Sequence, residues 1–405
     1  MKAELLAPAG NLEKLKIAVQ YGADAVYIAG ERFGLRAGAG NFTLCEMKEG
    51  LQFAHNKNKK VYVTMNVLPH NSDLNGMETY IRDIADFGVD AVIVSDPGVF
   101  SLVREINPGM PIHISTQANV TNFRSALFWQ QQGVSRIIAA RELSLEELKF
   151  IKRMLPGIEL EVFVHGAMCI SYSGRCLLSN FMCGRDANRG DCAHPCRWKY
   201  HLVEENRPGE YFPVIEDESG TFIFNSKDLC MIQSIPELID SGVNSLKIEG
   251  RMKSAFYVAT VVRAYRSAID AYYKNPEGYV FQNNWLEEVS KVSHRSFTTG
   301  FLLGKPGSES QNYGTGNYIK TWEFAGVVRF FCDKDKIAVI EQRNRILKGD
   351  TIEIMQPDGQ DISFVVDDMW DMDGNIITSA PHAQMNIRIK TSRPVLPGSI
   401  LRKKL

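Results

Sequence analysis

The sequence predicts an α/β protein: a (β/α)8 TIM-like barrel with a long cysteine-rich insertion after strand seven, plus a small C-terminal antiparallel β-barrel domain. Two observations predict this architecture. Over roughly the first 270 residues, eight short runs rich in β-branched residues each precede a longer amphipathic segment, and eight βα units can close a barrel. After residue 320 the helical segments stop, and short strands alternate with turns.

The strict alternation of strand and helix implies parallel pairing through right-handed crossovers. The expected strands cover residues 4–6, 24–28, 61–65, 90–94, 112–116, 136–139, 160–164 and 244–248. Helical patterns cover residues 12–21, 77–87, 122–132, 144–154 and 253–273, and Ser144 with Glu147 predicts a capping box. An open doubly wound sheet is the alternative, but no Gly-x-Gly-x-x-Gly motif follows the first strand.

The expected domains are a catalytic barrel at residues 1–275, a linker at 276–320 and the C-terminal β-barrel at 321–405. The barrel domain contains the insertion, residues 165–233, which is far longer than a simple connection and is therefore expected to be functional. Two strands are expected inside it, at 200–203 and 221–224. The C-terminal strands are expected at 324–331, 336–340, 350–354 and 362–366.

The composition is that of an ordinary globular protein. Of 405 residues, 44% are hydrophobic and 23% are charged, and no apolar run is long enough to span a bilayer. The first ten residues lack the basic and apolar regions of a signal peptide, so we expect a cytoplasmic protein with reduced thiols. The net charge of −1 argues against coating nucleic acid through global charge, although local basic patches remain possible.

Four cysteines, Cys169, Cys176, Cys192 and Cys196, form the pattern C-x6-C-x15-C-x3-C within the insertion. They stand among Gly, Arg, Ser and Asp, which does not resemble core sequence, and the expected compartment disfavours disulfides. Structural zinc remains an alternative, but zinc sites usually use close pairs of cysteines, and only Cys192 and Cys196 form one. The wide gaps favour a [4Fe–4S] cluster, which takes four thiolates.

Four further cysteines complete the set. Cys230 could replace Cys196 as the fourth ligand, and Cys183 is a weaker candidate. Cys45 and Cys332 fall in helix and strand patterns, so we expect them in the core.

Polar residues follow most of the expected barrel strands. They are Asn66, Asp96, Gln117, Asn119, Arg141, Glu142, His165, Glu249 and Arg251. Taken singly, each has a structural explanation; Asp96 before Pro97, for example, suits a helix cap. Because barrel enzymes place their chemistry where strands end, the repetition at one end of successive strands predicts a polar pocket.

These residues carry a resemblance to a known family. Residues 161–179 (EVFVHGAMCISYSGRCLLS) resemble the signature of peptidase family U32, and residues 184–198, 225–228, 245–251, 5–10 and 22–27 extend the match. The resemblance spans essentially the whole chain. With its four cysteines and C-terminal barrel, the chain is most similar to the family's tRNA uridine hydroxylases; one departure is Cys230, where the family pattern has arginine.

The resemblance implies an oxygen-independent, prephenate-dependent hydroxylation that makes 5-hydroxyuridine at the wobble position of tRNA. It implies a [4Fe–4S] cluster on Cys169, Cys176, Cys192 and Cys196. A cofactor suits such chemistry because no ordinary side chain supplies it. The expected partners are therefore tRNA and prephenate, with a homologous partner subunit possible.

The expected site residues follow from this reading. Prephenate is a dicarboxylate, so Arg141 and Arg251 are expected to clamp it. The remaining expected substrate-binding residues are Asn66, Gln117 and Lys247. His165 and Glu249 are the expected catalytic residues, although His165 could instead support the metal site, and Lys247 could pair with Glu249. For tRNA, the expected contacts are Arg185, Arg189, Arg197 and Lys199, with Trp198 stacking on a base.

Two other functions remain open. The family name implies a collagenase-like peptidase, but the sequence has no His-Glu-x-x-His zinc helix and no Gly-x-Ser-x-Gly elbow. A third possibility is a non-catalytic iron–sulfur subunit that binds RNA beside an enzymatic partner. The polar strand ends count against that possibility.

Overall fold

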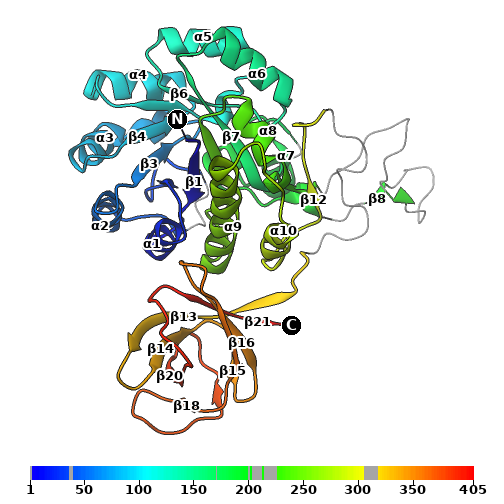
Figure 1. Cartoon of the computed structure of the whole chain (residues 1–405). Helices are drawn as coiled ribbons and strands as arrows, with labels where there is room; N and C mark the ends of the chain where they lie inside the picture. The colour runs from blue at the N-terminus through cyan, green and yellow to red at the C-terminus, as the bar shows by residue number, and fades with distance from the viewer. Residues whose placement is uncertain are drawn as a thin grey trace.

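The computed structural model describes residues 2–35, 40–169, 171–198, 201–202, 212–213, 226–304 and 318–405. Figure 1 shows a barrel domain with the C-terminal domain packed below it. No helix in these ranges is both long and apolar enough to cross a membrane.

The barrel domain contains a closed ring of eight parallel strands, as predicted. The strands are β1 (Glu4–Pro8), β2 (Ala25–Ile28), β3 (Lys60–Met65), β4 (Ala91–Val94), β5 (Ile112–Ile114), β6 (Arg136–Ile138), β7 (Glu159–Ala167) and β11 (Ser245–Ile248). The ring closes because β11 pairs in parallel with both β1 and β7. An open doubly wound sheet is thereby excluded.

Helices follow the strands and surround the ring (Figure 1). They are α1 (Leu12–Gln20), α2 (Leu44–His55), α3 (Met77–Asp86), α4 (Pro97–Ile106), α5 (Phe123–Gln131), α6 (Leu145–Met154), α8 (Ile235–Asp240) and α9 (Ala255–Lys274). The capping box predicted from Ser144 and Glu147 is present at the start of α6. Asp96 caps α4 through the backbone N–H groups of Gly98 and Val99, so its role is structural.

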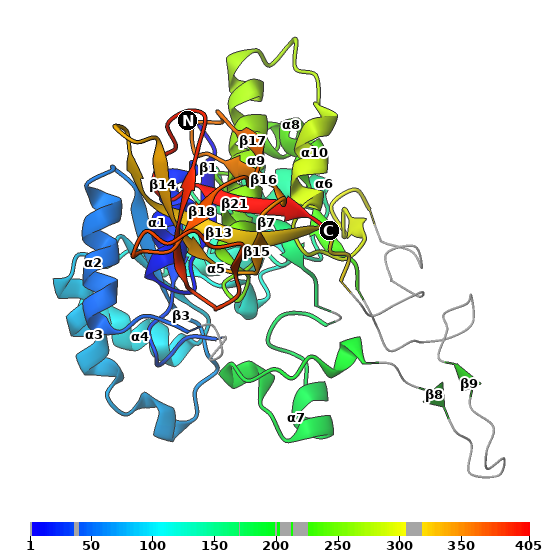
Figure 2. The same ribbon diagram turned by 90° about the horizontal axis from the view of Figure 1, so that it is seen from below.

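The cysteine-rich insertion leaves the barrel at the carboxyl end of β7. It contains α7 (Leu178–Cys183), and Figure 2 shows α7 at the end of the barrel away from the N-terminus. Part of the strand expected at 200–203 is present as β8 (His201–Leu202), which pairs with β9 (Phe212–Pro213). The strand expected at 221–224 lies outside the described residues.

The insertion returns to the barrel through β10 (Asp228–Cys230), a short strand that the sequence did not reveal. It pairs antiparallel with the end of β7, where Cys230 faces His165, and β12 (Phe297–Thr298) pairs with its other edge. The expected linker, 276–320, is structured in its described part, because it forms α10 (Asn283–Ser290) and β12. Both ends of the insertion are therefore fixed to β7.

The C-terminal domain is antiparallel, as predicted, but it is a half-barrel. Its strands are β13 (Trp322–Cys332), β14 (Ile337–Gln342), β15 (Ile346–Leu347), β16 (Thr351–Met355), β17 (Ile362–Val365), β18 (Met369–Trp370), β19 (Ser379–Ala380), β20 (Asn386–Lys390) and β21 (Ile400–Lys404). Seven of them form one sheet in the order β17-β16-β21-β13-β14-β20-β18, and its two edge strands do not pair with each other. β15 and β19 form a separate pair.

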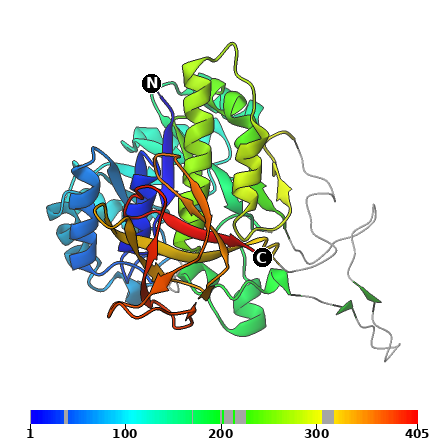
Figure 3. The same ribbon diagram turned by 60° about the horizontal axis from the view of Figure 1, so that its bottom comes forward.

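The two domains are joined by a buried ionic contact. Arg402 on β21 is fully buried and donates to Glu288 on α10 at 2.9 Å and to Glu353 on β16. At the C-terminal cap of α1, the hydroxyl of Tyr21 donates to the carbonyl of Met355 at 2.7 Å. Figure 3 shows the strands of this domain lying over the barrel's helices. The C-terminal domain is thus held against the outside of the barrel and leaves its mouth open.

Candidate active site

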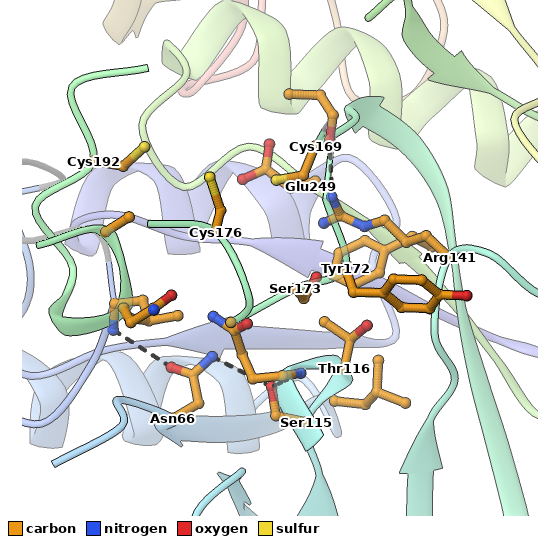
Figure 4. A pocket seen from close by; sticks show the side chains of 18 of the residues that line it. Asn66, Ser115, Thr116, Arg141, Cys169, Tyr172, Ser173, Cys176, Cys192 and Glu249 are labelled. Atoms are coloured by element: carbon orange, nitrogen blue, oxygen red, sulfur yellow. Dashed lines mark hydrogen bonds between the residues drawn. The ribbon is translucent and has the colours of Figure 1, made fainter. Parts of the chain in front are cut away.

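A cavity of about 1190 Å³, measured with the space at its open mouth, lies at the carboxyl ends of the barrel strands. It is lined by all of the expected substrate-binding residues and by Glu249; the substrate-binding set is Asn66, Gln117, Arg141, Lys247 and Arg251. Cys169, Cys176, Cys192 and Cys196 line the same cavity. Residues separated by up to 185 positions are brought together because parallel strands end at one rim (Figure 4).

The floor of the cavity carries a buried lysine. Lys247 on β11 is 3% exposed, and its Nζ donates to Glu161 on β7 at 2.7 Å. The same Nζ lies 4.5 Å from the centre of the Tyr27 ring and 5.3 Å from that of Phe163. Burial lowers the pKa of Lys247, while the neighbouring Glu161 opposes that shift. The possible pairing with Glu249 is wrong, because Lys247 pairs with Glu161.

Two arginines stand on the walls. Arg141 follows β6. Its guanidinium is 4.1 Å from the Phe163 ring centre, and its Nη1 donates to the carbonyl of Ala167 at 3.1 Å. Its Nε is buried without a hydrogen-bond partner. Arg251 is 4% exposed, and its Nη1 lies 3.5 Å from Oδ1 of Asn41. Cations on the floor and walls suit an anionic ligand.

Amide groups line the side formed by β3 and β5. Asn66 Nδ2 donates to Ser115 Oγ at 3.4 Å, as the dashed line in Figure 4 marks, which fixes the orientation of that amide. Gln117 Oε1 is buried without a partner. Gly174 lies against this side chain with φ of +75°, and a Cβ at that position would be only 2.9 Å from Gln117 Oε1. Glycine is therefore needed where the insertion covers Gln117.

The four cysteines occupy the outer part of the cavity, where Figure 4 shows the sulfurs of Cys169, Cys176 and Cys192 pointing into one region beside Glu249. The backbone N–H of His194 donates to Cys192 Sγ at 3.4 Å, which is the type of contact that tunes a cluster thiolate. Within the described ranges, no three His, Cys, Asp or Glu side chains are placed to hold a single metal ion.

The other cysteines lie elsewhere. Cys230 is buried and its Sγ is 4.0 Å from the hydroxyl of Tyr265 on α9; it does not line the cavity, and neither does Cys183. Cys230 is therefore not placed to replace Cys196. The expectation that Cys45 and Cys332 are core residues is wrong, because Cys45 is exposed at the start of α2 and Cys332 is half-buried at the end of β13.

His165 does not reach the cavity, contrary to the expectation that it is a proton donor there. Its ring is 1% exposed and packs among Tyr257, Tyr265 and Phe297. Burial lowers its pKa to about 3, with smaller effects from His294 and Lys253. The cause is a shift in the register between β11 and β7. Lys247 on β11 pairs with Phe163 on β7, but the residue after Lys247 pairs with His165, so one residue of β7 is skipped. Such a bulge turns the following side chain to the other face.

Of the expected tRNA contacts, Arg185, Arg189 and Trp198 lie on the insertion and do not line the cavity. Arg185 and Arg189 are half-exposed, but Arg185 pairs with Asp191 at 2.6 Å and Arg189 with Asp73 at 2.5 Å. Trp198 is 47% exposed, as its expected stacking role requires. The side chain of Arg197 and all of Lys199 lie outside the described residues. Next to this group, Phe181 on α7 is 85% exposed, and Tyr172 at the cavity rim is 47% exposed.

Two further residues shape the site: Asn119 was among the polar residues expected after the strands, whereas Glu161 was missed by the sequence analysis. Asn119 donates to the carbonyl of Ser173 at 2.9 Å and so ties the insertion to the rim of the barrel. Glu161 is fully buried beneath the cavity floor, where it contacts both Lys247 and Arg136. A signal for Glu161 existed, because a glutamate inside an apolar strand needs a buried cation.

Comparison with known proteins gives concordant matches. A sequence model of peptidase family U32 matches residues 10–312, and a model of the peptidase family U32 C-terminal domain matches residues 320–402. The tRNA hydroxylation protein P1 of Bacillus subtilis (strain 168) is 43% identical over 402 residues, which cover 99% of this chain and 95% of that protein. The tRNA hydroxylation protein P of Escherichia coli (strain K12) is 40% identical, covering 94% of this chain and 92% of that protein.

A ribosomal RNA enzyme is also similar. The 23S rRNA 5-hydroxycytidine C2501 synthase of Escherichia coli (strain K12) is 35% identical over 312 residues, which cover 76% of this chain and 46% of that protein.

Proposed function

The chain belongs to peptidase family U32, and from that premise we propose that it is a tRNA-modifying hydroxylase of the cytoplasm. The product is 5-hydroxyuridine at the wobble position. The reaction uses prephenate and a [4Fe–4S] cluster and does not use molecular oxygen. The observation that carries the proposal is the meeting of four cysteines, two arginines and a lysine around one cavity at the barrel mouth.

The names of the relatives support the reaction class. Two relatives that match nearly the whole chain are named for tRNA hydroxylation. A third is named for making 5-hydroxycytidine in ribosomal RNA, which places a hydroxyl group on C5 of a pyrimidine. A uridine in tRNA is the corresponding substrate for this chain.

The cavity has groups of the kind that a dicarboxylate needs. The ammonium of Lys247 at the floor takes one carboxylate, and Arg141 and Arg251 on the walls take the other. The partnerless Nε of Arg141 is a donor that a bound anion would satisfy. Asn66 and Gln117 offer amides to the polar edge of the base. Glu249, which lies beside Cys169, would hold or accept a proton between the two substrates.

Cys169, Cys176, Cys192 and Cys196 would hold the cluster. When bound, it supplies the redox or Lewis-acid chemistry that side chains lack. The insertion around it receives the tRNA: Trp198 stacks on a base, and the basic residues Arg185, Arg189, Arg197 and Lys199 face phosphates. Arg185 and Arg189 must then exchange their carboxylate partners for phosphate, so binding should weaken steeply with salt.

The deciding experiment measures the wobble uridine of tRNA by mass spectrometry in cells that lack this protein. We expect 5-hydroxyuridine to be absent and to return with the wild-type chain but not with Cys176→Ala. The matched control is Cys183→Ala, which removes a thiol of the same insertion that does not line the cavity and should restore the product.

Reconstitution separates the remaining functions. Anaerobically purified protein with a cluster and prephenate should convert unmodified tRNA without oxygen. Restoration in cells but no turnover in vitro would identify a non-catalytic subunit. Unchanged uridine in the deletion strain together with cleavage of a collagen-like peptide would identify a peptidase.

A further inference from the structure

Beneath the cavity floor, one buried carboxylate serves two cations. Glu161 on β7 is fully buried; Oε1 accepts from Lys247 Nζ at 2.7 Å and Oε2 accepts from Arg136 Nη1 at 3.1 Å. Arg136 on β6 is 4% exposed and also contacts Glu4 at 2.6 Å and Glu159 at 2.7 Å. The charges thus form a continuous chain from the cavity floor toward the amino end of the barrel.

We propose that Glu161 is a positioning residue: it holds the ammonium of Lys247 charged and fixed at the cavity floor, so that the floor binds one carboxylate of the anionic co-substrate. The inference rests on the proposed function only for the identity of that anion. Among the described residues, Glu161 is the carboxylate in contact with Lys247 Nζ, and the other contacts of Nζ are the ring faces of Tyr27 and Phe163. Without Glu161, no group of opposite charge in these contacts would hold Nζ in place.

The surroundings of Lys247 explain why it needs this carboxylate. Arg136 on β6 and Arg141 after β6 both repel its charge, and burial disfavours it. Tyr27 on β2 presents its ring to Nζ, and its hydroxyl donates to the carbonyl of Ile248 at 3.0 Å. Glu4 on β1 is occupied by Arg136, Tyr62 and Ser245. Glu161 is therefore the group that keeps the lysine protonated.

The chain offers a matched control for a change at Glu161. Glu159 lies two residues earlier on β7 and contacts the same Arg136, but its side chain is 41% exposed and its ion pair is with Arg136, whereas Lys247 pairs with Glu161. Glu159→Gln therefore disturbs Arg136 without touching the floor. Glu161→Gln disturbs both. The difference between the two variants isolates the effect on Lys247.

The test measures binding of malonate and prephenate to the full chain by calorimetry across pH. Loss of a charge-assisted contact is expected to weaken binding by about tenfold to a hundredfold in Glu161→Gln, and little in Glu159→Gln. Lysine binds anions below its pKa and not above it. Because Glu161→Gln lowers that pKa further, binding should be lost at a lower pH than in the wild type.

A second variant covers the case in which Glu161→Gln does not fold. Glu161→Asp keeps the charge but withdraws it by one methylene, so affinity should fall while the pH profile stays in place. A merely structural role predicts equal affinity and equal pH profiles for the Glu161 and Glu159 variants, and that result would overturn the proposal. So would a wild-type protein that binds neither anion.

The failures of the two proposals are distinguishable. Wild-type protein that restores 5-hydroxyuridine in cells and binds both anions, with an affinity and pH profile that Glu161→Gln changes no more than Glu159→Gln does, contradicts the inference alone. Anion binding that follows Glu161 as expected, without any hydroxylated uridine, contradicts the proposed function and leaves the inference standing.

Discussion

The side chain of Asn119 donates to the backbone carbonyl of Ser173 at 2.9 Å, which fastens the cysteine-rich insertion to the end of β5. The same Nδ2 donates to the carbonyl of Gln117 at 3.0 Å. Asn119 has φ of 53°, in the left-handed region that asparagine tolerates better than most residues. The Asn119 side chain therefore shapes the rim of the cavity and holds the cysteine-rich insertion against it.

This contact can be tested with two substitutions of Asn119. Asn119→Gly removes the side-chain hydrogen bonds and relieves the backbone, so it should cost about 1 kcal/mol of unfolding free energy. Asn119→Ala removes the same bonds and adds left-handed strain of roughly 1 kcal/mol. Hydrogen exchange at residues 171–176 should rise in both variants. Unchanged protection in both would show that the insertion is held by other contacts.

Substitution of Cys176 should remove iron from the protein, whereas substitution of Cys230 should lower its stability. Cys176→Ala is expected to lose iron and the associated chromophore of the anaerobically purified protein, because Cys176 lines the cavity. Cys230→Ala should keep the iron content and lose about 1–2 kcal/mol of stability, since its sulfur is buried beside Tyr265. Iron analysis and urea unfolding measure the two effects separately. Loss of iron in Cys230→Ala would restore it as a candidate ligand.

The contact between the domains should fail in acid. Burial raises the pKa of Glu288, but hydrogen bonds and charge from Arg402 and Lys291 outweigh burial and lower this pKa to about 2. A carboxyl with a depressed folded pKa stabilises the protein above its unfolded pKa, near 4.5, and that stability is lost as the pH falls toward 2. The contribution is on the order of 2–3 kcal/mol.

Arg402→Met tests this contact because it leaves Glu288 and Glu353 without their buried partner. The free energy of unfolding at pH 7 should fall by about 3 kcal/mol, and the dependence on pH between 5 and 2 should flatten. Lys404→Ala, two residues along β21 and exposed, is the control and should behave as wild type. Equal acid sensitivity of wild type and Arg402→Met would contradict the assignment.

Two buried histidines should make the protein less stable below neutral pH. Burial lowers the pKa of His165 to about 3 and holds that of His113 well below its usual value. Each is neutral in the folded state, so its stabilising effect is complete above pH 6.5 and declines as the pH falls toward the folded pKa. One pH unit below 6.5, each residue should cost about 1.4 kcal/mol.

Denaturant unfolding at pH 7.5 and 5.5 checks this expectation. His165→Gln should lose less stability between the two pH values than the wild type, because glutamine does not titrate. His55→Gln is the control, because the His55 ring is exposed to solvent and is not buried like that of His165. The His55 ring lies 2.9 Å from Asp90. If the wild type were equally stable at both pH values, the buried neutral state would be wrong.

Much of the site could be predicted because the carboxyl ends of parallel strands meet. Asn66, Gln117, Arg141 and Glu249 lie far apart in the sequence, yet each follows a strand of the same closed ring. The capping box at Ser144 could also be predicted, since its two residues are close in sequence and interact locally. These features depend on periodicity and on topology alone.

The features that were missed depend on contacts that no local pattern encodes. A single skipped residue in β7 turns His165 away from the cavity. Arg189 is engaged by Asp73, 116 residues away. The openness of the C-terminal sheet depends on whether its edge strands β17 and β18 meet, and strand content alone does not determine this. The role of Glu161 became clear only from its contacts with Lys247 and Arg136 in the structure.

The chain of ion pairs inside the barrel restricts which substitutions this sequence can accept during evolution. Glu4, Arg136, Glu161 and Lys247 balance one another inside the barrel, where all but Glu4 are nearly fully buried, so the loss of one member strands its neighbour's charge at a cost of about 3–5 kcal/mol. Compensating changes must arrive together, or one of them must first be tolerated at reduced stability. Relatives that read a different anion would therefore be expected to exchange these positions as a set.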